Sequence, residues 1–438
     1  MNKHFWAFAI IVALCTGFLA GVFLQYHQVP YRIKWSIIYA IQDISGKSRF
    51  DYSLPVDPAK LEAFGEPIQV FDTRTTPYVG STKPESSAMD RDEFLSYRYF
   101  WHFKEIADYL VSSEAKQTAS RIHQDFWTVD ENSITGYLAV MEPKRRFLKK
   151  ALGIEDLPTN GKVKDRSIIV DNDTIVIEKM LLESRIPAIS VPCYVAKPKT
   201  MKIKGVVIAI GGVASVPEKV IGIEPRDYTR QFGRELARDG YVVFAPYIIN
   251  ISNRTANISG LGMLYTGNTH WSIDLQKLLS VVDHIKNDPA LSELPIATYG
   301  ISIGGLFAAM LPAVDTRIDI AISSGRLTRT PNEGDYEIEK DINKVNYVLV
   351  NNIYEVVCFK YSDYARLIYP RPLVIEMGAL DNPIDDTVLW EEIKQIYSRH
   401  NMDKNLKLVW FRGFHETAPK LVKPVLNELV KETKQQGR

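Results

Sequence analysis

The chain is poor in cysteine and has no excess of charge of either sign. Its three cysteines, Cys15, Cys193 and Cys358, are too few and too far apart for a disulfide scaffold or a Cys-x-x-Cys zinc site, although a single Cys193–Cys358 bridge stays open. Fifty-three basic residues against 52 acidic ones leave a net charge of +1, which gives no reason to expect nucleic acid or another polyanion as partner. We expect a small molecule or an uncharged polymer instead.

Motifs that hold metals or nucleotides are also missing. The stretch HETAP, which begins at His415, lacks the second histidine of His-Glu-x-x-His. The GLG at residues 260–262 lacks the third glycine of Gly-x-Gly-x-x-Gly, and the chain has no Gly-Lys-Ser/Thr. We therefore expect no metal and no cofactor.

One long run without charge stands near the N-terminus. The stretch FWAFAIIVALCTGFLAGVFL, residues 5–24, is 20 residues long, about the length an α-helix needs to cross the hydrocarbon core of a bilayer. We expect residues 1–28 to form a membrane anchor, with a cleaved signal peptide as the alternative. Lys3 before the run is balanced by Arg32 and Lys34 after it. A short N-terminus before one span favours export, so we expect the bulk of the chain outside the cytoplasm, in a periplasmic or extracellular position.

The rest of the chain divides into two parts that differ in their pattern of apolar residues. With 46% hydrophobic residues, it can bury one large core plus a smaller lobe. Residues 29–164 are predicted to be mainly helical, because apolar residues recur at three- and four-residue spacings in DEFLSYRYFWHFKEIADYLV and ITGYLAVMEPKRRFLKKALGI. Residues 165–438 alternate strand-like apolar runs with amphipathic helices, and we expect them to form a separate domain.

The strand-like runs of the second part predict an α/β fold. They include VVIAI, YVVFAP, PIATYG, IDIAISS, RPLVIEMG and LKLVWFRG, and helices such as YTRQFGRELARDG, which ends at Gly240, separate them. Unbroken apolar strands between helices indicate a mainly parallel sheet covered on both faces. Functional residues of such sheets lie beyond the carboxyl ends of the strands.

A candidate nucleophile lies at one of these ends. In TYGISIGGLFAAM, Ser302 stands where PIATYG ends and a run of helix formers begins. Gly-x-Ser-x-Gly alone arises by chance in roughly one chain in ten of this length. The strand–turn–helix context is what a nucleophile elbow requires, with small neighbours at Gly300 and Gly304 and the positive end of the helix dipole below the oxygen.

A serine hydroxyl needs a base, and the base needs an orienting acid. Among eight histidines, His415 directly follows LKLVWFRG and is the preferred candidate; His270, which opens a helix after a loop, is the rival. Asp381 follows RPLVIEMG and is the preferred acid. Asp385 and Asp386 are expected to cap the next helix.

The chain order and the oxyanion donors complete this arrangement. Serine, acid and histidine follow one another as in α/β-hydrolases. The tetrahedral oxyanion would be held by the N–H of Ile303 and by the turn at Gly212 and Val213, after VVIAI. Glycine at that turn is equally explained as a tight strand exit.

From about residue 165 onward, the chain resembles an α/β-hydrolase of the dienelactone hydrolase and acetyl-xylan-esterase-like branch, which shares features with prolyl oligopeptidase catalytic domains. The matching stretches are VPCYVAKPKTMKIKGVVIAIGG, ELARDGYVVFAP, LLSVVDHIKNDPALSELPIATYGISIGG and YARLIYPRPLVIEMGALD, together with the His415 loop. The resemblance implies Ser302 as nucleophile, Asp381 as acid, His415 as base, and Ile303 with the Gly212 region as oxyanion hole. The chain has Ile-Gly-Gly where many relatives have His-Gly, so the amide that completes the hole stays open.

These observations favour a serine hydrolase that cleaves a carboxylic ester through an acyl-enzyme intermediate, on a small-molecule or carbohydrate-linked substrate. Two alternatives stay open. The same triad could serve a peptidase or amidase, although residues 29–164 are too few for the propeller that a prolyl oligopeptidase carries. The fold could also be a binding scaffold without catalysis.

Overall fold

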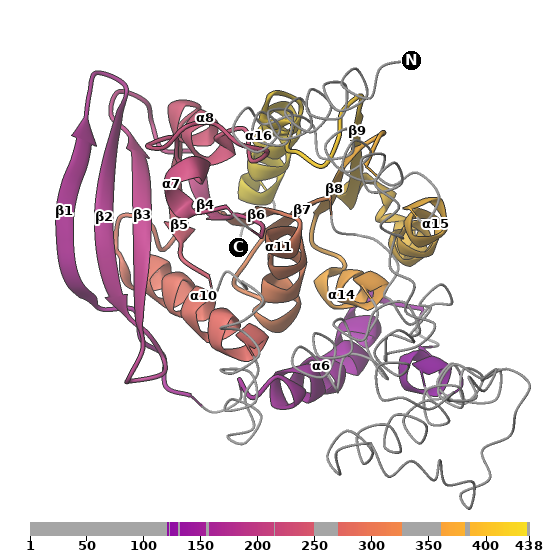
Figure 1. Cartoon of the computed structure of the whole chain (residues 1–438). Helices are drawn as coiled ribbons and strands as arrows, with labels where there is room; N and C mark the ends of the chain where they lie inside the picture. The colour runs from indigo at the N-terminus through magenta and orange to yellow at the C-terminus, as the bar shows by residue number, and fades with distance from the viewer. Residues whose placement is uncertain are drawn as a thin grey trace, which may run out of the picture.

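The computed structural model of this chain (Figure 1) describes residues 121, 123–129, 132–154, 157–213, 215–248, 270–325, 361–381 and 386–435. No helix within these ranges is long and apolar enough to cross a bilayer. The predicted anchor, residues 5–24, lies outside the described residues, so the anchor stays a prediction.

The described strands form one sheet of nine, in the order β1-β2-β3-β5-β4-β6-β7-β8-β9. Neighbours from β5 to β9 are parallel, whereas β1, β2, β3 and β5 pair antiparallel. The strands are β1 (Val163–Asp171), β2 (Ile175–Glu183), β3 (Ser190–Pro198), β4 (Gly205–Ile210), β5 (Tyr241–Pro246), β6 (Ile296–Ile301), β7 (Ile320–Ser324), β8 (Leu373–Gly378) and β9 (Leu406–Phe411).

Helices cover both faces of this sheet, as predicted (Figure 1). They are α6 (Ile134–Ala151), α7 (Pro217–Val220), α8 (Phe232–Arg238), α10 (His270–Asn287), α11 (Ile303–Val314), α14 (Tyr361–Ile368), α15 (Asp386–Tyr397) and α16 (Pro419–Gln435), with the short 3-10 helices η3 (Arg399–Asn401) and η4 (Asp403–Asn405). The predicted mainly parallel α/β architecture is confirmed for the described residues.

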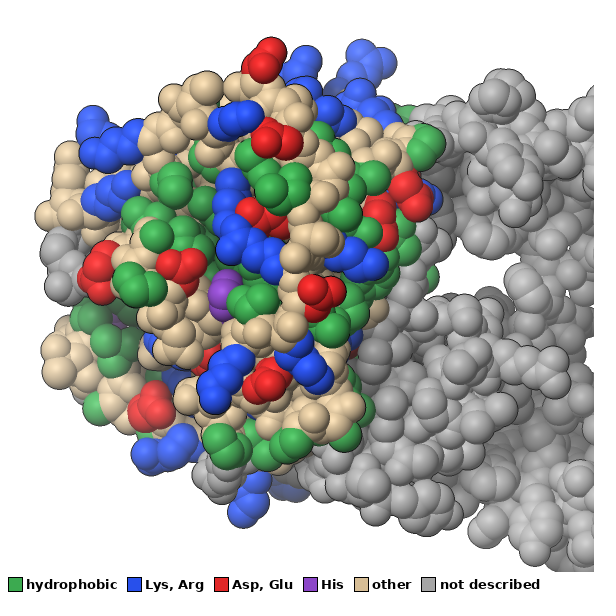
Figure 2. Space-filling model, turned by 90° about the vertical axis from the view of Figure 1, so that its left-hand side faces the viewer, with side chains coloured by type: hydrophobic (Ala, Val, Ile, Leu, Met, Phe, Trp, Pro, Cys, Tyr) green, Lys and Arg blue, Asp and Glu red, His purple; other side chains and the backbone are tan. Residues whose placement is uncertain are grey.

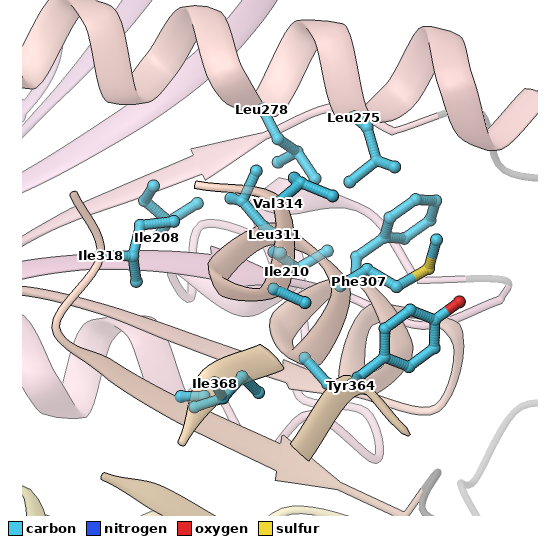
Figure 3. Packing of buried hydrophobic residues seen from close by; sticks show 14 of the residues in the cluster. Ile208, Ile210, Leu275, Leu278, Phe307, Leu311, Val314, Ile318, Tyr364 and Ile368 are labelled. Atoms are coloured by element: carbon cyan, nitrogen blue, oxygen red, sulfur yellow. The ribbon is translucent and has the colours of Figure 1, made fainter. Parts of the chain in front are cut away.

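Two hydrophobic cores lie on opposite faces of the sheet because side chains alternate along each strand. Ile208 of β4 belongs to a core that also contains residues of α6, α10, α11 and α14, whereas Val207 belongs to a core with residues of α7, α8 and α16. Figure 3 shows Leu278 of α10 beside Val314 of α11 in the first core. The central strands β4, β5, β6, β7 and β8 are buried along their whole length, which explains their unbroken apolar sequences.

The antiparallel end of the sheet differs from this buried centre. Every residue of β1 is exposed except Val170, which is half-buried. Glu178 of β2 pairs with Arg166 of β1 at 2.5 Å and with Lys197 of β3 at 3.0 Å. Figure 2, which looks at the side of the molecule that carries β1, shows charges of both signs intermixed with apolar side chains. This distribution agrees with the near-zero net charge of the sequence.

The helical part before the sheet contributes to the first core. The helix predicted over ITGYLAVMEPKRRFLKKALGI is α6, which begins after Ser133, whose hydroxyl accepts from Gly136 N–H at 3.1 Å. Tyr137 is buried and donates to the carbonyl of Arg366 in α14 at 3.1 Å. The boundary predicted near residue 165 stays a prediction.

One predicted helix is wrong at its start. The pattern in YTRQFGRELARDG placed the first turn at Tyr228, but α8 begins at Phe232. Arg230 and Gln231 have φ angles of 54° and 56°, a left-handed conformation that no right-handed helix contains. The preceding residues make tertiary hydrogen bonds instead, and these bonds are described below with the site.

Candidate active site

Ser302 occupies a strained turn at the carboxyl end of β6. Its φ of 59° and ψ of −124° are unfavourable for a residue with a side chain, and such conformations cluster at functional sites. A Cβ added at Gly300 would lie 2.0 Å from the Gly304 carbonyl oxygen, and one at Gly304 would lie 2.3 Å from that of Ile210. The two glycines of the motif are therefore required by close backbone contacts. Ser302 itself is half-buried.

The backbone around Ser302 presents N–H groups from a helix start. Ser302 donates its own N–H to Ser324 of β7 at 2.9 Å, and its carbonyl accepts from Leu306 at 3.1 Å. Ile303 is the first residue of α11, where the first N–H groups have no acceptor within the helix. The positive end of the helix dipole therefore lies next to the serine.

The turn after β4 lies against the same serine. A Cβ added at Gly212 would lie 2.9 Å from Ser302 Cβ and 2.6 Å from the hydroxyl oxygen of Tyr228. Val213 is 43% exposed, and its carbonyl accepts from the Tyr228 hydroxyl at 2.6 Å. Of the residues predicted to line the oxyanion hole, Ile303 follows Ser302 in sequence, Gly212 lies next to it in space, and Val213 follows Gly212 in the same turn. Their roles as donors stay predictions.

His415 and Asp381 form a hydrogen-bonded pair at the ends of two neighbouring strands. His415 follows β9, Asp381 follows β8, and the distance from Nδ1 of the histidine to Oδ2 of the aspartate is 2.7 Å. Because Nδ1 serves the carboxylate, Nε2 is the nitrogen that would exchange a proton with a nucleophile.

Gly325 shows that the pair and the serine share one location. This glycine follows Ser324, the residue that accepts the Ser302 N–H, and it has a φ of 57°. A Cβ added to it would lie 3.1 Å from both Cε1 and Nδ1 of His415 and 3.3 Å from Oδ2 of Asp381. The fold therefore brings the three predicted residues together around Gly325, from positions up to 113 residues apart in the numbering.

The rival candidates from the sequence lie elsewhere or outside the described residues. His270 opens α10, as expected, but its side chain lies outside the described part. Asp386 is the first residue of α15, and Asp385 is not described. Cys193 is a buried free thiol whose pKa is raised by burial, so the optional bridge to Cys358 is wrong. Within the ranges that the structure describes, no His, Cys, Asp and Glu side chains cluster in a way that could hold a metal ion.

The sequence did not indicate Tyr228 as a site residue, because the residues around it have the apolar pattern of a helix. The Tyr228 ring stacks on the His415 ring, with centroids 6.1 Å apart and planes at 30°. Burial raises the pKa of the Tyr228 hydroxyl, so this group stays a neutral hydrogen-bond donor throughout the range in which proteins work.

Sequence reasoning also missed Glu376, although a carboxylate inside the apolar run RPLVIEMG was a signal. Its side chain is fully buried and accepts from the Tyr299 hydroxyl at 2.8 Å and from the Ala418 N–H at 2.5 Å. Burial raises the pKa of Glu376 to about 7, and the hydrogen bonds from Ala418 and Tyr299 oppose the rise.

Comparisons with known proteins bear on the fold. No family model matches the sequence. A structure from Bacteroides fragilis NCTC 9343, provisionally named an acetyl xylan esterase, superposes with a TM-score of 0.53 at 14% identity, over 68% of this chain and 81% of that one. The present protein therefore has the α/β-hydrolase fold.

Other proteins with this fold agree. The glucuronoyl esterase from Solibacter usitatus superposes on this α/β-hydrolase-fold chain with a TM-score of 0.52 at 13% identity, over 68% of this chain and 93% of that one. In sequence, YtaP of Bacillus subtilis (strain 168), provisionally named a hydrolase, is 28% identical over 191 residues, 41% of this chain. The chain spans 62% of the length of YtaP. The predicted resemblance is thereby confirmed at the level of the fold.

Proposed function

We propose that this protein is a serine hydrolase that cleaves carboxylic esters through an acyl-enzyme intermediate. The observation that supports the proposal is the arrangement around Gly325, which follows the residue that accepts the Ser302 N–H and lies against the 2.7 Å pair of His415 and Asp381. The esterases with the same fold and the relative named a hydrolase support ester hydrolysis as the reaction class.

The proposed reaction assigns one role to each group. Ser302 Oγ attacks the ester carbonyl while His415 Nε2 takes the hydroxyl proton, and Asp381 holds the imidazole and stabilises its cation. The N–H groups of Ile303 and the turn at Gly212 and Val213 stabilise the oxyanion. The alcohol leaves with the proton from His415. A water molecule then gives a proton to His415 and attacks the acyl carbonyl, and the carboxylic acid leaves as His415 returns the proton to Ser302 Oγ.

The proposed substrate is an ester attached to a carbohydrate. Two solved structures with this fold are named for acetyl xylan and glucuronoyl ester hydrolysis, which supports this class.

A membrane anchor at residues 5–24 with the catalytic domain outside the cytoplasm is also proposed, on the sequence alone.

Labelling with a fluorophosphonate probe tests the nucleophile. We expect the full-length protein to be modified at Ser302, as mapped by mass spectrometry, and Ser302→Ala to lose both the label and roughly 10⁵- to 10⁶-fold of kcat on an aryl acetate. Ser398→Ala, at an exposed serine after α15, is the matched control and should keep both.

A substrate panel tests the reaction class. Acetylated xylan oligosaccharides, a methyl ester of glucuronic acid and a peptide anilide should separate esterase from peptidase activity, with turnover of the esters expected. A folded protein that takes no label and hydrolyses no acyl ester would instead support the binding scaffold.

A further inference from the structure

Residues 227–230, here called the Tyr228 segment, contact two loops that carry the proposed machinery. One is the β4 loop, residues 211–213 with Ser215, and the other is the β9 loop, residues 412–418, which contains His415. The segment precedes α8 and replaces the helical turn that the sequence predicts there.

Two side chains of the segment hold the β4 loop. The Tyr228 hydroxyl donates to the Val213 carbonyl at 2.6 Å, and Ser215 donates to Asp227 Oδ2 at 2.9 Å. The other oxygen of Asp227 accepts from the N–H and the hydroxyl of Thr229, at 2.8 and 2.5 Å, so the aspartate is fixed within the segment. These bonds determine where the loop backbone lies beside Ser302.

Its contacts with the β9 loop come from backbone and side chains. Thr417 donates its N–H to the Tyr228 carbonyl at 3.1 Å and its hydroxyl to the Thr229 carbonyl at 2.6 Å. Arg230 forms an ion pair with Glu416, next to His415, and the Tyr228 ring stacks on the imidazole. The base is thus flanked by the same segment that fixes the β4 loop.

The backbone of the segment is strained, which is consistent with a role that the surroundings impose. Arg230 and the following Gln231 both have positive φ angles without being glycine. This conformation is unfavourable for a residue with a side chain, so it persists only because the contacts on both sides hold it.

We propose that Tyr228 is a positioning residue that fixes the position of the oxyanion-binding backbone of the β4 loop relative to the His415 imidazole. The inference rests on the proposed function. The hydroxyl of Tyr228 holds one loop, its ring and carbonyl hold the other, and both loops must keep their geometry in the transition state.

The first test is Tyr228→Phe, which keeps the ring and removes the bond to Val213. We expect kcat on p-nitrophenyl acetate to fall about 10- to 100-fold with KM within about twofold, because oxyanion contacts strengthen mainly in the transition state and small displacements there are costly. The rate of fluorophosphonate labelling should fall with kcat.

A matched control is Tyr241→Phe. Tyr241 is buried and, like Tyr228, donates its hydroxyl in a hydrogen bond, here to Asn427 at 2.7 Å, but it begins β5 at the opposite end of the strands. It should lose some thermal stability and keep kcat. An equal fall of kcat in both variants, or an unchanged kcat in Tyr228→Phe, would overturn the proposal.

The second test combines Tyr228→Phe with Thr417→Val, which removes the hydroxyl bond to the Thr229 carbonyl. If one segment sets both loops, the loss in the double variant should be smaller than the product of the single losses. A simple product would mean that the loops are held independently, and the proposal would be wrong. Wild-type protein without labelling or esterase activity would instead refute the proposed function itself.

Discussion

Two carboxylates, Glu376 and Asp381, lie near the end of β8, and they differ in burial and in their hydrogen-bond partners. The Asp381 side chain is 15% exposed and pairs with His415. Glu376 is fully buried, accepts hydrogen bonds from Tyr299 and Ala418, and has a pKa raised to about 7. Both stand in the same stretch, RPLVIEMGALD, yet only one can assist an imidazole directly.

The comparison shows how the sheet separates a proposed catalytic acid from a structural one. Asp381 comes after the strand has ended, where the β8 and β9 loops meet and a charge keeps some access to water. Glu376 lies within the strand, where desolvation disfavours its charged form. Its hydrogen bond with the Ala418 N–H connects β8 to the residue before α16. We therefore interpret Glu376 as a support for the β9 loop, which carries His415.

Of the two carboxylates, the proposed acid should have the larger effect on activity when it is replaced. Asp381→Asn keeps the size but cannot hold the imidazole in the required tautomer, so kcat should fall roughly 10³- to 10⁴-fold on an aryl ester, with little change in thermal stability. Glu376→Gln, assayed in parallel, should lose less than tenfold. Equal losses would break the distinction between the two carboxylates.

Glu376 should instead contribute a pH dependence of stability. Its pKa rises from 4.5 to about 7 on folding, so the folded chain keeps a proton that the unfolded chain releases. The stabilisation is complete below about pH 4.5 and is lost as pH rises through 7, up to about 3 kcal/mol.

Urea unfolding at pH 5 and pH 8 measures this effect. The free energy of unfolding should fall with pH more steeply in the wild type than in Glu376→Gln, because glutamine does not titrate. Identical pH dependence in the two proteins would show that the carboxyl titrates normally. Asp381→Asn gives the complementary control, since it leaves Glu376 in place.

A smaller effect is expected at Gly325, which lies against the histidine–aspartate pair. Gly325→Ala adds a Cβ 3.1 Å from the imidazole at a φ of 57°, and should lower kcat about tenfold and stability by about 1–2 kcal/mol. Gly240→Ala is the matched control, because Gly240 also has a positive φ, of 100°, but lies far from His415, at the start of β5. Gly240→Ala should lose stability and keep kcat. A loss of activity in Gly240→Ala would show that the contact with the imidazole does not explain the effect of Gly325→Ala.

Much of the fold could be predicted because its signals are local. The apolar runs of β4 to β8 are unbroken since both faces are covered, and the helices α6, α10 and α16 follow their periodicity. The helix predicted to start at Tyr228 failed because its first residues bond to Thr417, which is nearly 190 positions away. Periodicity read over a few neighbouring residues cannot reveal such partners.

The sequence by itself determined the alternation of strands and helices, the glycine spacing that allows the Ser302 turn, and the chain order of the three candidate residues. Tertiary structure alone decided that the Asp381 and His415 side chains form a hydrogen bond, that Gly325 lies against this pair, and that the Tyr228 ring stacks on the imidazole. The physical reason is that strand order and register, which join distant segments, place the strand ends side by side, whereas local propensity acts only between near neighbours along the chain.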